Sequence, residues 1–240
     1  MSEMTERILS RRKVLDFLDG QVTSGEISES YYIPAGSSVV DRLGLSEEAL
    51  ALAAKSKTGV VIFRTASRHV VILPPFPVKE QYLAQGFEAN ALRVLLTREY
   101  KLALILVRLG AYAVGWCEGE KLVASKVGTG LIHAWNKKGG SSAQRYGLHR
   151  EKQIEAFVSR ICGHIREHIE PRAKALDYAV YGGSREALLA LKKGCPLLAK
   201  FEDRALPPLL DIPDPNQATL EKVVRRIWTS RLFEFSITHV

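Results

Sequence analysis

The residues best suited to chemistry lie together in one glycine-rich stretch, residues 135–146, with the sequence WNKKGGSSAQRY. The adjacent glycines Gly139 and Gly140 permit positive φ and let a ligand approach the main chain closely. Lysines precede them, and a glutamine and an arginine follow at the start of a predicted amphipathic helix. Cationic side chains bind phosphates with a strength that falls as salt rises, and a helix start adds free N–H groups and a positive dipole end. The stretch therefore suits a polyanionic ligand.

Composition alone leaves simpler interpretations of this stretch open. A solvated polar loop in front of a helix would have the same residue types. A nucleotide-phosphate loop is disfavoured because the pattern G-x-x-x-x-G-K-[ST] is missing and the lysines come before the glycines.

Histidines supply further candidates for chemistry. His133 and His149 flank the glycine-rich stretch, and His149 is a candidate general base. His164 and His168 lie four residues apart on a predicted helix, but we expect no third ligand near them and therefore no metal site. The acidic residues of this helix region are expected to pair with lysine and arginine at the surface: Glu151, Glu155, Glu167 and Glu170.

The three cysteines, Cys117, Cys162 and Cys195, stand far apart without C-x-x-C spacing. This usage indicates a reducing compartment and argues against zinc or a disulfide framework. Cys162 falls within an apolar helical stripe, where a small buried hydrophobe is the expected role.

Charge and hydropathy narrow the class of partner. The net charge is +8 and the pI about 9.4, which favours nucleic acid or an acidic membrane surface. The charged N-terminus lacks the apolar core of a secretory signal. The longest apolar run, Leu102–Val107, is too short to cross a bilayer. We therefore expect a cytoplasmic protein with no membrane partner.

Residues 1–96 are expected to form a small α/β domain. Hydrophobic spacing, turn residues and β-branched runs predict its elements. These are a helix over Ile8–Leu18 that stops at Gly20, a helix from the N-cap Ser46 to about Ala54, a hairpin of Gly59–Phe63 and His69–Leu73, and a short helix over Phe87–Leu96.

Residues 97–240 are expected to form a second domain. The predicted elements are strands at Leu102–Leu109, Ala111–Cys117 and Lys121–Val127, a polar loop over 136–143, a long helix ended by Pro171, a strand at Asp177–Tyr181, a helix at Ser184–Lys193, a strand at Leu197–Phe201, a helix at Thr219–Trp228 and a last strand at Phe233–Ile237. Three antiparallel strands, a long helix and then alternating strands and helices predict an α/β (α+β) fold with a mixed sheet.

The stretch KGGSSAQRY at residues 138–146, followed by REK at 150–152, resembles the central domain of archaeal and eukaryotic class 1 peptide chain release factors. There the pattern is R-G-G-Q-S-A-x-R-F. The closer resemblance is to release-factor-like peptidyl-tRNA hydrolases of the VLRF type, in which the glutamine sits further along. The resemblance extends in element order from Lys101 onward and is specific around Gly139–Lys152. It implies a mixed sheet with flanking helices.

What the resemblance implies about the site can be stated residue by residue. Gln144 would order the attacking water, and the loop tip that reaches the CCA end of tRNA would consist of Gly139, Gly140, Ser141 and Ser142. Phosphates would be held by Lys137, Lys138, Arg145 and Arg150. No metal and no cofactor are implied. The partners would be the large ribosomal subunit with its rRNA, and peptidyl-tRNA, without DNA. No oligomeric state is indicated.

One departure from the release factor pattern concerns the glutamine itself. Ser141 occupies the place directly after the two glycines, and Gln144 comes three residues later. If the chain is already helical at Ser141, a shift of three residues keeps Gln144 near the same face. Otherwise the amide points elsewhere.

We expect a peptidyl-tRNA hydrolase that acts on stalled ribosomes or large subunits. The action would be codon-independent, because the N-terminal segment carries no codon-reading motif and no C-terminal module follows that would recruit a GTPase. Two alternatives stay open: a non-catalytic ribosome-binding factor and a nuclease that cleaves the tRNA 3′ end.

Overall fold

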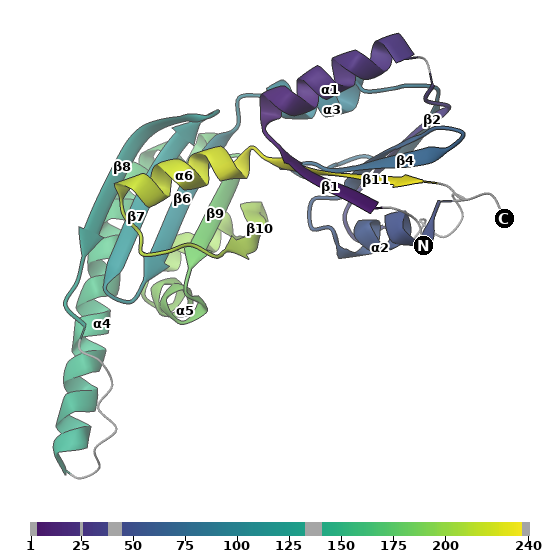
Figure 1. Ribbon diagram of the computed structural model, residues 1–240. Coiled ribbons are helices and arrows are strands. Elements are labelled where there is room, and N and C mark those ends of the chain that lie inside the picture. Colours follow the sequence, from purple (N-terminus) through teal and green to yellow (C-terminus); the bar gives the residue numbers. More distant parts are fainter. Residues whose placement is uncertain (1–3, 25, 38–44, 133–140, 237–240) are drawn as a thin grey trace. The chain divides into compact units, whose positions relative to one another are not determined.

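The computed structural model (Figure 1) describes residues 4–24, 26–37, 45–132 and 141–236, with the side chains at 23, 24, 141–144 and 146 left out. The chain divides into two compact units. Unit 1 consists of Met1–Arg98 and Arg225–Val240, and unit 2 of Glu99–Val224. The domain boundary expected near residue 97 lies next to the first division between the two units, which falls between Arg98 and Glu99. The expected second domain, however, included residues 225–240, which group with unit 1 because their strand pairs there.

In the described part of unit 1, six strands form one antiparallel sheet in the order β1-β11-β4-β3-β2-β5. The strands are β1 (Met4–Leu9), β2 (Glu29–Ile33), β3 (Val60–Arg64), β4 (Arg68–Leu73), β5 (Tyr82–Gln85) and β11 (Ser230–Ser236), and the helices are α1 (Arg11–Ser24), α2 (Glu47–Lys55) and α3 (Asn90–Thr97). Alternate side chains of the sheet face opposite sides. Val61 and Phe63 share a core with α1 and α3, whereas Val60 and Ile62 share one with α2.

Two local predictions for unit 1 are confirmed. Ser46 is the N-cap of α2, and its hydroxyl accepts a hydrogen bond from the Ala49 N–H at 3.4 Å, which satisfies one of the free donors of the first turn. The two β-branched runs pair as the antiparallel hairpin β3–β4. Local sequence signals are therefore enough to predict the start of α2 and the β3–β4 hairpin.

The prediction of a helix over Ile8–Leu18 is wrong at both ends. Ile8 and Leu9 belong to strand β1, and α1 begins at Arg11 and continues past Gly20 to Ser24. Strand β1 forms because β11, far away in the sequence, hydrogen-bonds to it, and Ile8 remains 68% exposed. A glycine in a helix interior costs only about 1 kcal/mol relative to alanine, so Gly20 does not end α1.

In the described part of unit 2, five strands form a mixed sheet in the order β10-β9-β6-β7-β8, as the sequence predicted in kind. Strands β6, β7 and β8 form an antiparallel meander, whereas β9 and β10 run parallel to β6. The elements are β6 (Lys101–Arg108), β7 (Ala111–Glu118), β8 (Lys121–Thr129), α4 (Ser141–His168), η2 (Glu170–Ala175), β9 (Tyr178–Gly183), α5 (Arg185–Gly194), η3 (Pro196–Arg204), β10 (Ala205–Leu210) and α6 (Gln217–Ile227), where η marks a 3-10 helix.

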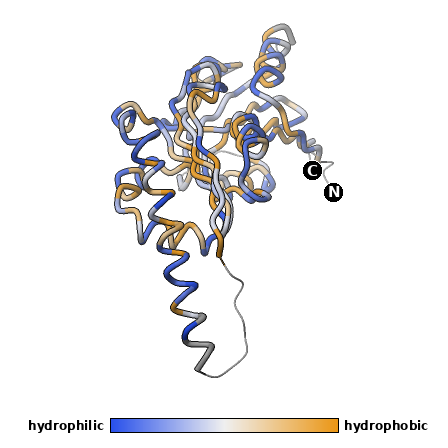
Figure 2. Tube along the Cα trace, turned by 90° about the vertical axis from the view of Figure 1, so that its left-hand side faces the viewer, coloured by the Kyte–Doolittle hydropathy of each residue, from blue (hydrophilic) through white to orange (hydrophobic). Residues whose placement is uncertain are grey.

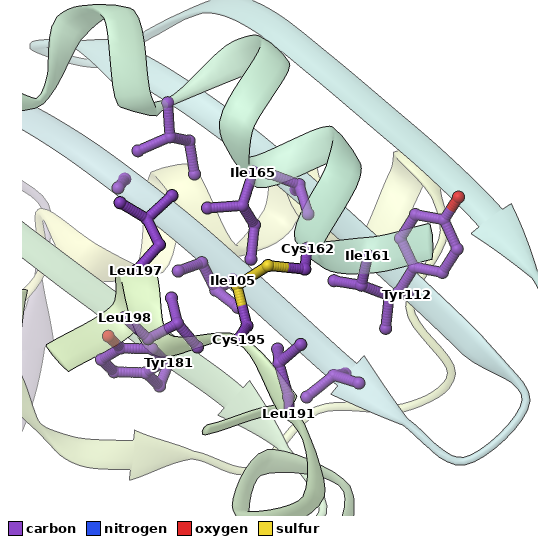
Figure 3. Close-up of a cluster of buried hydrophobic side chains, with 14 of the residues drawn as sticks. Ile105, Tyr112, Ile161, Cys162, Ile165, Tyr181, Leu191, Cys195, Leu197 and Leu198 are labelled. Carbon is purple, nitrogen blue, oxygen red and sulfur yellow. A yellow bond between two sulfur atoms is a disulfide. The ribbon is translucent and has the colours of Figure 1, made fainter. Parts of the chain in front are cut away.

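Helices cover both faces of this sheet. Ala103, Ile105 and Val107 of β6 belong to a core with α4, α5 and η3 (Figure 3). The opposite face packs against α6: a side chain on Gly115 of β7 would meet Leu220 of α6. The predicted strand at Leu197–Phe201 is wrong: these apolar residues lie in η3, where Leu197, Leu198 and Phe201 are buried. Strand β10 takes the place beside β9 instead.

The cysteines depart from expectation in one respect. Cys162 of α4 and Cys195, the C-cap of α5, form a disulfide with Cα atoms 5.4 Å apart (Figure 3). The prediction of no disulfide is wrong because 33 residues of sequence separate two positions that the helix packing brings together. Cys162 is buried, as predicted. Burial also raises the pKa of the Cys117 thiol to about 12, so Cys117 is not a nucleophile at neutral pH.

The end of β9 yields a stability prediction. Gly183 has a φ of +111°, and a Cβ there would overlap the carbonyl oxygen of Val107, which accepts a hydrogen bond from the Ser184 N–H at 3.0 Å. We expect Gly183→Ala to lower the free energy of unfolding by more than about 2 kcal/mol in urea titrations.

Gly163→Ala is the matched control for that substitution. Gly163 is helical and has open space around the position of a Cβ, so alanine should stabilise the protein by about 0.5–1 kcal/mol. Equal urea midpoints for Gly183→Ala and the unmodified protein would contradict the described end of β9.

Candidate functional site

The structure describes only part of the predicted site. Lys137, Lys138, Gly139 and Gly140 lie outside the described residues, as do His133 and Trp135. Three further predicted positions have a described backbone within α4, but their side chains lie outside the described set: Ser141, Ser142 and Gln144. Arg145 and Arg150 are described with their side chains. The chain thus leaves β8, passes through the glycine-rich stretch and enters α4.

Helix α4 begins at Ser141, so Ser141 and Gln144 are three residues apart on one helix. Residues at this separation are neighbours on a helix surface. The condition stated for the shifted glutamine is therefore met: the chain is helical at Ser141, the position that follows the two glycines. On this backbone Gln144 lies near the same face of the helix as Ser141. His149 lies five residues after Gln144, about 140° around the helix, so it does not share that face.

The first part of α4, residues 141–153, forms an arm whose described side chains lie outside the core cluster of unit 2. Among the described side chains from Arg145 to Gln153 none is buried, and Leu148 is 61% exposed. Core packing becomes complete at Phe157. Gln144 precedes Phe157 by 13 residues, or about 20 Å along the axis at 1.5 Å per residue. Figures 1 and 2 show this part of α4 extending beyond the sheet of unit 2.

The base of the arm is fixed at the end of β8. The Gly130 N–H donates to the Gly110 carbonyl at 2.9 Å, and Arg160 Nη1 donates to the Thr129 carbonyl at 2.9 Å. A Cβ on Gly130 would overlap the ring of Phe157. The glycine that ends this strand therefore permits close packing of strand and helix, and these contacts fix the end of β8 against the middle of α4.

The sequence that contains the arm is rich in positive charge. Residues 137–160 carry six lysines and arginines against two glutamates. Arg145 is exposed, whereas Arg150 is partly buried, with its Nη2 3.8 Å from Glu186 Oε1 on α5. A partly exposed ion pair of this length contributes little to stability, but it directs Arg150 toward α5. Of the predicted phosphate ligands with described side chains, Arg145 is the one exposed to solvent.

A group at the other end of α4 was missed. The expectation that no third ligand lies near His164 and His168 is wrong, because Glu167 Oε2 lies 3.4 Å from His164 Nδ1 and 3.6 Å from His168 Nε2. Glu167 therefore faces histidines and not the expected lysine or arginine. Glu170 does pair with a lysine, Lys200, at 3.6 Å. The spacing H-x-x-E-H was visible in the sequence and could have indicated the group.

The described α-helices are between 8 and 28 residues long. Among them, none combines sufficient length with sufficient apolar character to cross a bilayer.

Similarity to solved structures is low in identity and spread over release-factor-like proteins. An archaeal translation termination factor, aRF1, matches with a TM-score of 0.43 and 16% identity, covering 92% of this chain and 73% of that one. Pelota of Archaeoglobus fulgidus matches with a TM-score of 0.34 and 9% identity over 95% and 63%. Dom34 of S. cerevisiae matches with a TM-score of 0.33 and 10% identity over 93% and 63%. This chain therefore spans less than two thirds of Pelota and Dom34.

The family comparison is the more specific. Residues 100–233 match the family described as Actinobacteria/chloroflexi VLRF1 release factor. The match covers more than half of the chain and includes the glycine-rich stretch, α4 and the mixed sheet of unit 2. It confirms the kinship that residues 138–152 indicated, and the chain belongs to the Actinobacteria/chloroflexi VLRF1 release factor family.

Proposed function

We propose that this protein hydrolyses the ester bond of peptidyl-tRNA on stalled ribosomes or free large subunits, without reading a codon. The observation that carries the proposal is the start of α4 at Ser141, which sets Gln144 in the first turn of a cationic helical arm. Membership of a release factor family supports the reaction class. Action on ribosomes would take place in the cytoplasm, with rRNA and tRNA as the partners that the net charge of +8 favours.

The reaction needs a positioned water more than a strong base. The water oxygen bonds to the ester carbonyl carbon, the bond from that carbon to the ribose oxygen breaks, and a proton from the water passes to the ribose oxygen, which leaves as a hydroxyl. Holding the water in line with the carbonyl supplies much of the rate gain. A carboxamide both donates and accepts hydrogen bonds and carries no charge to desolvate in an RNA-walled cavity. Gln144 would therefore orient the water, and substrate or rRNA groups would move the proton.

The arm supplies reach. The arm sets Gln144 about 15 Å along the helix axis from Ile154, which packs against the core of unit 2, so its tip could enter a narrow RNA cavity while unit 2 stays outside. Lys137, Lys138 and Arg145 would hold phosphates along the way, and Gly139 and Gly140 would let the tip pass close to the CCA end.

The first prediction concerns the glutamine. We expect Gln144→Ala to slow peptide release by about 10²–10³-fold, the usual cost of removing one positioned polar group from a reacting centre, while cosedimentation with large subunits stays unchanged. The measurement uses purified subunits that carry peptidyl-tRNA labelled in the peptide and at the tRNA 3′ end.

The matched control is Gln153→Ala, which removes a glutamine from the same helix outside the proposed tip and should release peptide at the parent rate. If Gln144→Ala is as fast as the parent, the water-positioning mechanism is wrong. Loss of the 3′ label would identify a nuclease. Cosedimentation of the parent without any turnover would identify a non-catalytic binding factor.

The second prediction concerns the cations at the tip. Reversing both charges, Lys137→Glu with Lys138→Glu, should weaken binding to large subunits and lower the slope of log affinity against log salt by about 2, because each phosphate contact releases counterions. Binding is measured by sedimentation at a series of salt concentrations.

Lys55→Glu with Lys57→Glu is the control, since both lysines are exposed on unit 1 and the change in net charge is the same. This variant should keep the parent salt slope. An identical loss of slope in both variants would show that net charge alone, and not the arm, governs binding.

A further inference from the structure

Three potential metal ligands meet at the packed end of α4. His164 Nδ1, Glu167 Oε2 and His168 Nε2 all lie within 4.8 Å of one another. The carboxylate oxygen is 3.4 Å from the first nitrogen and 3.6 Å from the second. Both histidine side chains are about one fifth exposed, whereas Glu167 is 65% exposed, so the carboxylate forms the side of the group that is open to solvent.

The helix and the sheet hold this group in place. Positions i, i+3 and i+4 share one face of a helix, which directs all three side chains to the same side. The His164 ring stacks on Tyr112 of β7, with ring centroids 5.7 Å apart and planes at 22°. The His168 ring stacks in turn on His164 at 6.2 Å and 24°. The neighbouring Ile165 and Ile169 are fully buried in the core of unit 2, so the backbone that carries the ligands is fixed.

One of the donor atoms lacks an ordinary partner. His168 Nε2 is buried and has no hydrogen-bond partner among the described residues. Its distance of 3.6 Å from Glu167 Oε2 is too long for a hydrogen bond. Most buried polar atoms in folded proteins have a hydrogen-bond partner. A metal ion bound between His164, Glu167 and His168 would give His168 Nε2 the partner that it lacks among the described residues.

The spacing fits a tetrahedral ion. With metal–donor distances of about 2.0–2.2 Å, two donors of a tetrahedral zinc site are about 3.3–3.6 Å apart. The distances from Glu167 Oε2 to the two nitrogens are 3.4 and 3.6 Å, so small side-chain rotations suffice. Two imidazole nitrogens and one carboxylate oxygen suit first-row transition ions such as Zn²⁺, whereas Mg²⁺ and Ca²⁺ prefer oxygen ligands.

The nearest cations are turned toward carbonyl groups. Arg160 Nη1 donates to the Thr129 carbonyl and Arg172 Nη1 to the His168 carbonyl, both at 2.9 Å. The second bond satisfies a carbonyl in the last turn of α4. These interactions direct the two guanidinium groups to the backbone, whereas the nitrogen and oxygen atoms of the three ligands lie within 4.8 Å of one another.

We propose that His164, Glu167 and His168 bind one divalent transition-metal ion, Zn²⁺ by preference, with solvent completing the coordination. The site lies 20 residues along α4 from Gln144, about 30 Å at 1.5 Å per residue. The ion therefore takes no part in ester hydrolysis. The ion cross-links three side chains near the C-terminal end of α4, beside β7, and thereby stabilises that end of the helix. The arm lies at the opposite, N-terminal end of the same helix.

The test uses the full-length chain without an affinity tag, treated with a chelator that is then removed. Titration calorimetry with Zn²⁺ should show one equivalent bound, and Co²⁺ should give the visible absorption of a site with nitrogen and oxygen ligands. Zn²⁺ should also raise the unfolding temperature. In His164→Ala with His168→Ala, affinity should fall at least 100-fold and the temperature shift should disappear. In Glu167→Gln, affinity should fall about tenfold.

The control is His149→Ala, which removes an exposed histidine from the same helix and should bind Zn²⁺ like the parent. Far-ultraviolet circular dichroism checks that each variant is folded. The proposal is overturned if the parent binds no equivalent of Zn²⁺, or if the double histidine variant binds it as tightly as the parent. Gln144→Ala should keep full Zn²⁺ affinity, so failure of the catalytic proposal and failure of the metal site are distinguishable.

Discussion

The functional part of unit 2 depends on one packing layer, in which the second half of α4 lies against β6, β7 and α5. Phe157, Ile161 and Ile165 are buried there, and each fully buried side chain of this size contributes about 2 kcal/mol. The disulfide between Cys162 and Cys195 joins the same two helices. Because the second half of α4 is held so firmly, the first half can keep its direction with little packing of its own, namely Ile154 against the core and Arg150 beside Glu186. The exposed arm is therefore a consequence of the core beneath it.

Much of unit 2 could be predicted because its signals are local. Alternation and tight turns indicated β6, β7 and β8, and the stripe that includes Ile161 and Ile165 indicated a long helix. The Leu197–Phe201 strand was wrong because a short apolar run is buried equally well in a 3-10 helix packed on a sheet. Strand β1 was missed for a different reason. Its partner is β11, more than 200 residues away, and no local pattern carries that information.

The site shows the same division between local and long-range information. The diglycine, the lysines and Gln144 were proposed from their order in the sequence and stay a prediction, whereas the helix start at Ser141 agrees with the predicted change from loop to helix. The partner of Arg150 could not be predicted, because Glu186 belongs to another helix. The disulfide was missed for the same reason. By contrast, the third residue of the His164 group was within reach of the sequence, since Glu167 lies between the two histidines on one helix turn. Glutamates on helices rich in lysine and arginine usually form surface ion pairs, and that general expectation did not separate Glu167 from the other glutamates of α4.

The pairing of β1 with β11 also orders events during synthesis. The Arg231 guanidinium bonds Glu6 at 2.8 Å, two residues that the ribosome joins to the chain 225 positions apart. While translation proceeds, β1 has no neighbour in its sheet and β4 lacks one of its two, whereas unit 2, whose residues 99–224 are contiguous, can fold as soon as it emerges. Unit 1 is thus completed after unit 2, and a nascent chain that stops before β11 leaves the sheet of unit 1 with unpaired edges.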